Sequence, residues 1–234
     1  SQSEVWAFEP VDQPRDYLQK SIIANGLNNL KIAALALSSF SGSADMYSGA
    51  NTEMSTLNQS LAQEDLQKKS VPVTTLDEFC SEHFLEGVDF IKIDAEGEEE
   101  NVIRGGEKLF RISSPLVMFE IGVEERYLAV IKILQNQSYE IYRHVPGLNC
   151  LAPVDPGEDL DSFQLNLFAC KQDRAQWLIE KNLLTPKISD RDARDGSATL
   201  AAKIDPNNFP HFKFFDKSWV QEPSGTNFEE TAYL

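Results

Sequence analysis

The 234-residue chain carries a formal net charge of −16, and 41% of its residues are hydrophobic, a composition typical of one globular domain with room for an extension. Such a surplus of negative charge repels nucleic-acid phosphates and anionic lipid, and the lone basic pair Lys68-Lys69 is too short to offset it. Because no apolar run approaches the about 20 residues of a membrane helix, the sequence argues against both nucleic-acid partners and a membrane span.

The chain opens with a short apolar run, Val5–Phe8, which predicts a buried strand closed by a glutamate-proline pair. A helix is predicted next, beginning at Asp12 or Gln13 and ending at Asn25, where the following glycine provides a stop signal. The apolar run Leu30–Leu37 then predicts one further strand.

The region 38–70 is rich in Ser, Gly and Asn and gives weaker signals. It predicts a short strand at Asp45–Tyr47 and a polar helix or loop over Leu61–Lys69. Val71–Leu76 is predicted to be an edge strand, because Pro72 has no N–H to donate to a neighbouring strand.

The strongest strand signal is Val88–Ile93, which leads into the acidic segment Asp94–Glu100. The other predicted elements are the helices Asp77–His83, Glu98–Phe110 and Arg126–Gln137 and the strands Pro115–Ile121, Tyr139–Arg143 and Leu165–Cys170. Short apolar strands that alternate with helices are typical of a mostly parallel sheet covered on both faces. The sequence therefore predicts an α/β fold of the doubly wound type.

The chain changes character near residue 172, so we expect a domain over 1–172 and an extension over 173–234. The extension contains a predicted helix, Ala175–Leu184, and then an aromatic stretch between Phe209 and Trp219 among Pro, Asp and Asn residues. We expect it to pack on the domain; the alternative is a lid or a wall of an acceptor site.

The cysteines are Cys80, Cys150 and Cys170, an odd number without C-x-x-C spacing, which fits neither a disulfide framework nor a zinc site. The first ten residues lack the basic and apolar regions of a secretory signal. We therefore expect a cytoplasmic protein.

Polar residues that directly follow apolar strands are the main functional candidates, because doubly wound sheets bind ligands beyond the carboxyl ends of their strands. Glu9 follows the first strand, and Asp94 and Glu96 follow the strongest one. A strand-end carboxylate can bind ribose hydroxyls, although a solvated carboxylate or a helix cap explains Glu9 at least as well on spacing alone. The preference of acids for helix N-termini explains Glu98–Glu100. It does not explain Asp94 or Lys92, whose burial would need a partner.

Motifs of other chemistries are absent from the sequence. It contains no phosphate-binding G-x-x-x-x-G-K, no G-x-S-x-G nucleophile elbow and no H-E-x-x-H. The histidines His83, His144 and His211 are dispersed, so we interpret them as surface or packing residues.

A series of motifs resembles the FkbM family of methyltransferases. In order, the motifs are VWAFEP, NGL-x-NL, ALS, VTTLDEF, VDFIKIDAEGEEENVIRGG and PLVMFEI, and together they cover residues 4 to about 122. The resemblance implies a Rossmann-like class I methyltransferase fold that binds S-adenosylmethionine. It also implies methyl transfer to a hydroxyl of a small molecule or sugar.

The resemblance further implies roles for individual residues. Glu9 would hold the ribose hydroxyls, with Pro10 beside it, and Leu37 and Ser38 would lie near the adenine. Asp94 would contact the cofactor from the other strand end.

The same resemblance assigns the chemical step to Lys92, Asp94 and Glu96, which would face the methyl donor and the acceptor. Asp94 is the first candidate for orienting or deprotonating the acceptor hydroxyl, since a positioned carboxylate suffices when the sulfonium is already a strong electrophile. Which of the three acts as the base stays open.

One part of the family pattern is missing. Family members have a strand and a glycine-rich turn, D-x-G-A-N-x-G, directly before the AFEP strand, whereas this chain begins shortly before Val5. We expect that the natural protein has residues before Ser1, or that the chain as given cannot bind the cofactor normally.

Two alternatives follow from these observations. One is a non-enzymatic or degenerate domain that keeps the methyltransferase fold without cofactor binding. The other is a metal-dependent hydrolase using Asp94, Glu96 and Glu120, since acidic clusters also bind Mg²⁺. The leading prediction includes no metal site, and the sequence identifies neither the acceptor nor the oligomeric state.

Overall fold

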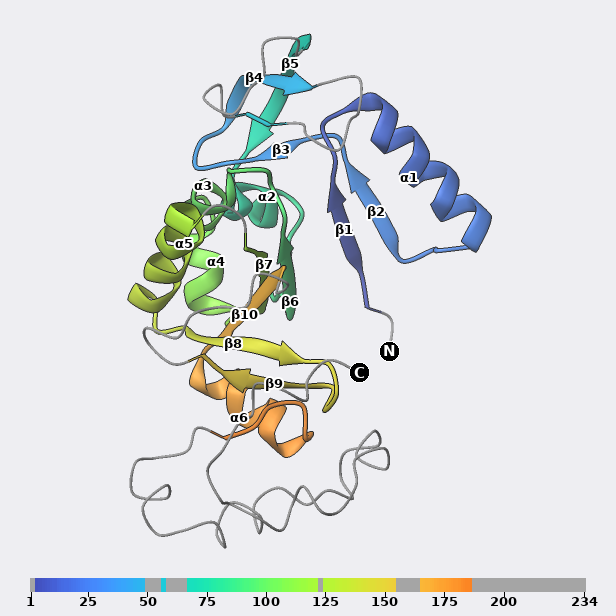
Figure 1. Cartoon of the computed structure of the whole chain (residues 1–234). Helices are drawn as coiled ribbons and strands as arrows, with labels where there is room; N and C mark the ends of the chain where they lie inside the picture. The colour runs from blue at the N-terminus through green and yellow to red at the C-terminus, as the bar shows by residue number, and fades with distance from the viewer. Residues whose placement is uncertain (1–2, 49–55, 58–66, 122–123, 155–164, 187–234) are drawn as a thin grey trace, which may run out of the picture. The chain divides into compact units, whose positions relative to one another are not determined.

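The computed structural model describes residues 3–48, 56–57, 67–121, 124–154 and 165–186 (Figure 1). The chain divides into two compact units: Ser1–Ile141 with Asp159–Arg174, and Tyr142–Glu158 with Ala175–Leu234. The candidate functional site lies within the first unit. The predicted division of the chain after residue 172 stays a prediction.

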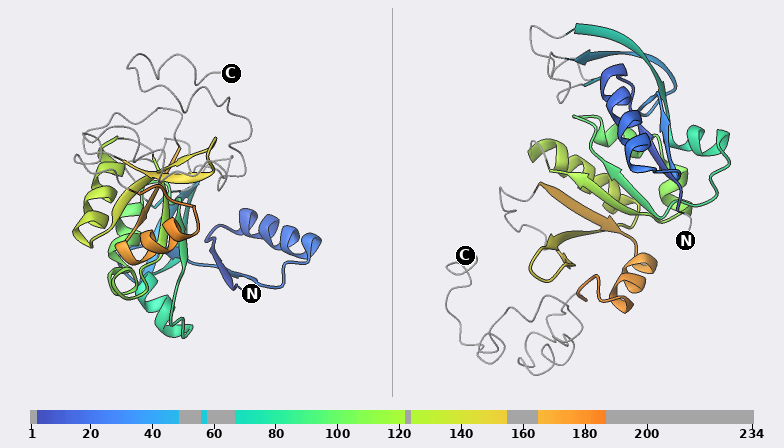
Figure 2. Two further views of the ribbon diagram at one scale, coloured as in Figure 1. Left: turned by 90° about the horizontal axis from the view of Figure 1, so that it is seen from below. Right: turned by 90° about the vertical axis from the view of Figure 1, so that its right-hand side faces the viewer.

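The first unit opens with a β-α-β segment. β1 (Val5–Phe8) and β2 (Leu30–Ala33) pair in parallel, and α1 (Asp12–Asn25) connects them. α1 ends where Gly26 adopts a φ of 63°, a left-handed conformation that glycine reaches without strain. Figures 1 and 2 show α1 running alongside the β1–β2 pair. The predicted first strand and first helix are confirmed.

The single strand predicted over Leu30–Leu37 is wrong. β2 ends at Ala33, and β3 (Ala36–Leu37) belongs to a separate three-stranded sheet with the order β3-β5-β4. Both pieces of the run are apolar, so hydrophobicity does not reveal that the chain changes its pairing partner between them.

The sheet β3-β5-β4 contains two longer strands. β4 (Gly42–Ser48) includes the short strand predicted at 45–47 and extends it on both sides. β5 (Gln67–Thr74) begins inside the segment predicted as a helix or loop, so that prediction is wrong for residues 67–69. Residues 61–66 of the same segment lie outside the described residues. The buried apolar side chains of this sheet are Ala36, Met46, Val71 and Val73.

β5 is the inner strand of this sheet, so the predicted edge strand is also wrong. β3 pairs only with Val73 and Thr74, whereas β4 runs past Pro72, which lies opposite Ser43. Among the described strands, Pro72 therefore has a pairing neighbour on one side only. A residue without an N–H tolerates that arrangement, because no hydrogen bond is lost on the other side.

A further sheet of the first unit contains β6 (Phe90–Ile93), β7 (Leu116–Glu120) and β10 (Asn166–Cys170) as consecutive neighbours. β6 and β7 pair in parallel, while β7 and β10 pair antiparallel. All three lie within strands predicted from apolar runs. The fully buried side chains of these strands include Val117, Phe119, Leu167 and Ala169.

α2 (Leu76–Glu82) confirms the helix predicted over 77–83 and carries an aromatic contact to the first strand. The ring of Phe79 lies with its centroid 5.0 Å from that of Trp6, 4.6 Å from that of Phe8 and 4.2 Å from that of His83. Apolar contact with α2 therefore anchors β1, and His83 has the packing role expected from the sequence.

The single helix predicted over Glu98–Phe110 is replaced by two short helices, α3 (Glu99–Arg104) and α4 (Glu107–Ile112). Gly105 lies at the break, and a Cβ atom there would come within 2.1 Å of the backbone oxygen of Ser38. This close approach excludes any side chain. Gly105 thus serves backbone packing as well as helix termination.

α5 (Glu124–Asn136) confirms the helix predicted over 126–137 and packs beside α3. After it, the buried Tyr139 donates its hydroxyl to the backbone oxygen of Phe110 at 3.0 Å. Burial raises the pKa of Tyr139, so the hydroxyl stays protonated and keeps donating at neutral pH.

β8 (Glu140–Val145) and β9 (Cys150–Pro153) form a hairpin, most of which belongs to the second unit. Its second strand was not predicted. Leu151 donates its N–H to the backbone oxygen of Leu183 at 2.8 Å. α6 (Gln172–Glu180) begins and ends earlier than the predicted helix 175–184. The aromatic stretch 209–219 lies outside the described residues.

The chain is of mixed α/β class, as predicted. Both parallel and antiparallel ladders occur, and β1 and β6 belong to different sheets, so the doubly wound arrangement stays a prediction. Cys150 and Cys170 are buried and Cys80 is partly exposed, and none of the three forms a disulfide. Within the described ranges, no helix combines the length and the apolarity that crossing a bilayer requires.

Candidate functional site

A cavity of about 740 Å³ lies at the carboxyl ends of β1 and β6. Its size is in the range of small-molecule sites. The charged side chains that line it are Glu9, Lys92, Asp94, Glu96 and Glu98, and the apolar ones include Val11, Leu37, Met46, Leu57 and Val102. Four charged residues predicted from strand ends are therefore brought together, along with Pro10 and Leu37.

Glu9 lies directly after β1 and is held by the start of α1. Its Oε1 accepts the N–H of Val11 at 2.8 Å. Among the described residues this is the hydrogen bond that reaches the carboxylate, and it leaves Oε2 without a donor. Partial burial raises the pKa of Glu9, while the N–H of Val11 and the nearby Arg15 act in the opposite direction.

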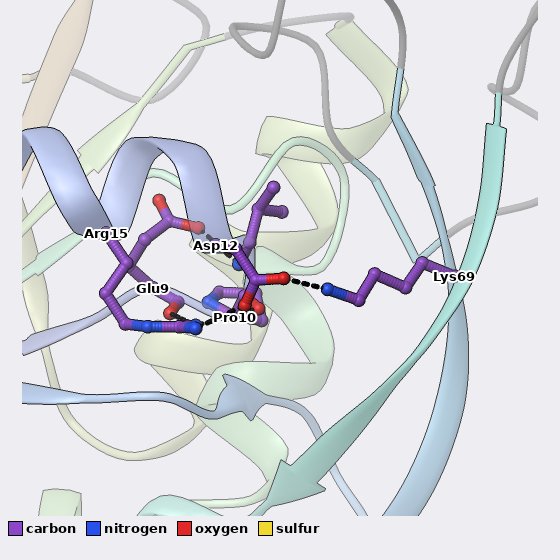
Figure 3. Close-up of polar contacts among 6 residues, drawn as sticks. Glu9, Pro10, Asp12, Arg15 and Lys69 are labelled. Atoms are coloured by element: carbon purple, nitrogen blue, oxygen red, sulfur yellow. Dashed lines mark hydrogen bonds and ion pairs between the residues drawn. The ribbon is translucent and has the colours of Figure 1, made fainter.

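Arg15 holds the backbone of Glu9 and Pro10 in place (Figure 3). Its Nη1 donates to the backbone oxygens of Glu9 and Pro10, each at 3.2 Å. The guanidinium also pairs with Asp12, which in turn pairs with Lys69 of β5. This chain of charges connects the turn after β1 to the sheet β3-β5-β4, which stands outside the β1–β2 ladder.

Lys92 and Asp94 form an ion pair at the end of β6. The Nζ of Lys92 lies 2.8 Å from Oδ2 of Asp94, and the two side chains are 51% and 41% exposed. The partner that burial would require is therefore present, but both side chains are largely exposed: Ile93 is buried, whereas Lys92 lies with Phe90 on the exposed face of β6. The hydrogen bond from Lys92 lowers the pKa of Asp94, so its carboxylate is ionised at neutral pH.

Asp94 has two carboxyl neighbours, Glu96 and Glu120, and ligand atoms of the three lie within 4.8 Å of one another. Burial and then the charge of Asp94 raise the pKa of Glu96. Burial, followed by contact with Asp94, raises the pKa of Glu120 as well. The metal-site alternative thus has carboxylates at a suitable spacing, but Lys92 already pairs with one of them and no second observation points to an ion.

Hydrogen bonds with the side chains of Glu99 and Thr56 hold the backbone of the loop that contains Glu96. Oε1 of Glu99 accepts the N–H groups of Ala95 and Gly97, each at 3.1 Å. Thr56 donates its hydroxyl to the backbone oxygen of Glu96 at 2.8 Å. Glu99 therefore satisfies N–H groups of the loop before α3, and the predicted capping of the helix N-terminus is not found at Glu98, whose side chain makes no cap hydrogen bond.

Ser38 lies behind the cavity wall. It is 1% exposed, and its hydroxyl donates to Oε2 of Glu98 at 2.9 Å. Glu98 is buried and lines the cavity, although sequence reasoning treated it as a helix-start acid. Its burial next to a serine 60 positions earlier in the chain is a tertiary property that the local pattern does not carry. The predicted contact of Ser38 with adenine stays a prediction.

Comparisons with known proteins agree with the motif series. The sequence profile described as "Methyltransferase FkbM domain" matches residues 1–141. Among solved structures, the chain is similar to an FkbM methyltransferase from Methylobacillus flagellatus KT, with 15% identity and a TM-score of 0.46. That match covers 71% of this chain and 36% of the other, so the chain spans about a third of that protein's length. No curated protein matches the sequence.

Proposed function

The chain belongs to the FkbM methyltransferase family, and on that premise we propose that it transfers a methyl group from S-adenosylmethionine to a hydroxyl of a small molecule or sugar. The observation that carries the proposal is the cavity at the ends of β1 and β6. It combines a strand-end glutamate with a separate charged cluster, and all of its lining residues fall within the matched part of the chain.

The residues around Glu9 suit the cofactor's nucleoside. Oε1 is committed to the N–H of Val11, so Oε2 can accept the ribose hydroxyls. Apolar side chains such as Leu37 and Met46 line the same cavity and suit a flat heteroaromatic ring. When bound, S-adenosylmethionine would supply an electrophilic methyl group on a sulfonium.

The charged cluster suits the acceptor hydroxyl. Lys92 keeps Asp94 ionised, so Asp94 can accept a hydrogen bond from the hydroxyl and orient it. The raised pKa of Glu96 makes it the stronger base of the two. We therefore assign orientation to Asp94 and proton acceptance to Glu96.

Isothermal titration of S-adenosylhomocysteine tests the cofactor part of the proposal. The titration uses the chain 1–234 and the full-length natural protein, each as wild type and as Glu9→Ala. Loss of a charged acceptor should weaken binding about 10- to 100-fold in whichever form binds, because a hydrogen bond to a charged group contributes about 1.5–3 kcal/mol.

The matched control is Glu86→Ala, which removes an exposed carboxylate from the same unit and should leave the affinity unchanged. Absence of binding by either wild-type form would contradict the proposal and favour a non-enzymatic domain. Equal affinities of the wild type and Glu9→Ala would remove Glu9 from the site.

A further inference from the structure

The wall of the cavity contains a carboxylate that is buried and yet lines the open space. Glu98 is 9% exposed and borders the cavity between β1 and β6. A buried carboxylate is costly unless hydrogen-bond donors surround it, because its charge has lost its water. The donors around Glu98 therefore show how much of its hydrogen-bonding capacity the protein itself uses.

The protein's donors occupy one side of this carboxylate. Ser38 donates its hydroxyl to Oε2 at 2.9 Å, and Asn101 donates its side-chain N–H to the same atom at 3.0 Å. Across the described part of the chain, no hydrogen bond to Oε1 accompanies them. Since a carboxylate has about four acceptor positions, Oε1 keeps its capacity for a donor that enters the cavity.

The two donors also hold the carboxylate in place. Ser38 is fully buried, and its N–H donates to the backbone oxygen of Thr74 at 3.1 Å. Asn101 lies on α3, whose first turn begins directly after Glu98. Because these two donors hold Oε2, the direction in which Oε1 points is also fixed. A group that recognises a ligand needs such a fixed direction.

Two apolar residues of the cavity wall are connected to Glu98. Leu37 precedes its partner Ser38, Val102 lies one helical turn beyond Glu98, and both line the cavity. An apolar surface with one fixed acceptor suits a flat ring that carries an N–H donor at its edge. Adenine has such a donor in its exocyclic amine, whereas a 6-oxo purine has an acceptor at that position.

We propose that Oε1 of Glu98 accepts the exocyclic amine of the bound nucleoside and makes the site selective for adenine over 6-oxo purines. The inference rests on the proposed function, because it assigns a specificity residue to that same cavity. An oxo group facing Oε1 would leave two acceptors opposed and unpaired. Such a mismatch costs about 1–3 kcal/mol, which corresponds to about 5- to 150-fold in affinity.

The experiment compares two nucleosides on two proteins by isothermal titration. S-adenosylhomocysteine and its 6-oxo analogue S-inosylhomocysteine are titrated into full-length wild type and Glu98→Gln. Glutamine keeps an oxygen for Ser38 and Asn101, and Asn101, which can only donate through its amide nitrogen, disfavours the flipped orientation. The glutamine NH₂ then replaces Oε1 and turns the acceptor into a donor.

Wild type should prefer the adenine compound by about 10- to 100-fold. Glu98→Gln should lose or reverse that preference, with S-inosylhomocysteine binding at least as well as S-adenosylhomocysteine. The control is Glu100→Gln, which makes the same chemical change at an exposed residue of α3 paired with Arg104 and should keep the wild-type preference.

The outcomes separate this inference from the proposed function. If wild type binds both compounds equally, or if folded Glu98→Gln keeps the wild-type preference, the inference fails and the methyltransferase proposal stands. If Glu98→Gln does not fold, equal affinities of the wild type for the two compounds still overturn the inference. If wild type binds neither compound, the proposed function fails and the inference with it.

Discussion

Two groups of polar residues close to each other in sequence differ in their surroundings. Lys92, Asp94 and Glu96 are exposed at the end of β6, whereas Glu98 is buried against Ser38. The exposed group is open to water, and we propose that the acceptor binds there. The buried group has fixed partners and a fixed direction. A single acidic run therefore holds residues suited to chemistry and residues suited to recognition, and burial distinguishes them.

The largest expected effect belongs to the exposed group. Asp94→Asn removes the charge that we propose orients the acceptor, so kcat for methyl transfer should fall about 10²-fold. The rate is the release of S-adenosylhomocysteine with the best acceptor from a panel of sugars and hydroxylated small molecules. The Kd of S-adenosylhomocysteine should change little. A variant with the wild-type rate would show that the two groups do not divide the work in this way.

The next effect tests the close contact between Gly105 and Ser38, the residue that donates to Glu98. Gly105→Ala places a Cβ atom within 2.1 Å of the backbone oxygen of Ser38, the residue that holds Glu98. Relief of that clash should cost about 1–3 kcal/mol of unfolding free energy. Urea denaturation measures the loss.

Gly87→Ala is the matched control for this substitution, because a Cβ atom there meets nothing within 4 Å. Its unfolding free energy should equal that of the wild type or exceed it slightly, since alanine restricts the unfolded chain. If Gly105→Ala were as stable as Gly87→Ala, the close contact behind Glu98 would not be rigid.

The smallest effect concerns the ion pair of the exposed group. Lys92→Met removes the partner that lowers the pKa of Asp94, so Asp94 should take up its proton at a higher pH in the variant than in the wild type. Stability at neutral pH should fall by no more than about 1 kcal/mol, because both side chains are exposed.

The sign of the stability change follows from the lowered pKa of Asp94. The contribution of a carboxylate with a lowered pKa is present above its unfolded pKa and is lost as the pH falls through the folded one. The difference between wild type and Lys92→Met should therefore vanish in acid, as thermal unfolding between pH 2 and pH 7 would measure. A difference that grows in acid would assign the stabilisation to another group.

The sequence predicts what depends on local pattern. The strand ends at Glu9 and Asp94, the helix α1 with its glycine stop and the strand β7 all follow from short apolar runs and turn residues. The charged residues chosen from those strand ends then meet in one cavity, because carboxyl ends of strands are where an α/β fold gathers polar groups.

What the sequence does not predict depends on partners far along the chain. The run Leu30–Leu37 is uniformly apolar, and only tertiary pairing divides it between two sheets. Gly105 is needed because Ser38 lies behind it, and Pro72 is tolerated because β3 is short. The burial of Glu98 is of the same kind. Residues of equal charge in one acidic run do not reveal which of them the fold covers.

Each of the two units contains a buried cysteine whose alkylation can report local unfolding of that unit. Cys170 lies in the first unit and Cys150 in the second, and both thiols are shielded from solvent. Burial also raises the pKa of Cys150, so little reactive thiolate is present in the native state. Alkylation of either thiol should then proceed only at the rate at which its surroundings transiently unfold. Labelling kinetics read by mass spectrometry would therefore rank the local stability of the two units within a single sample.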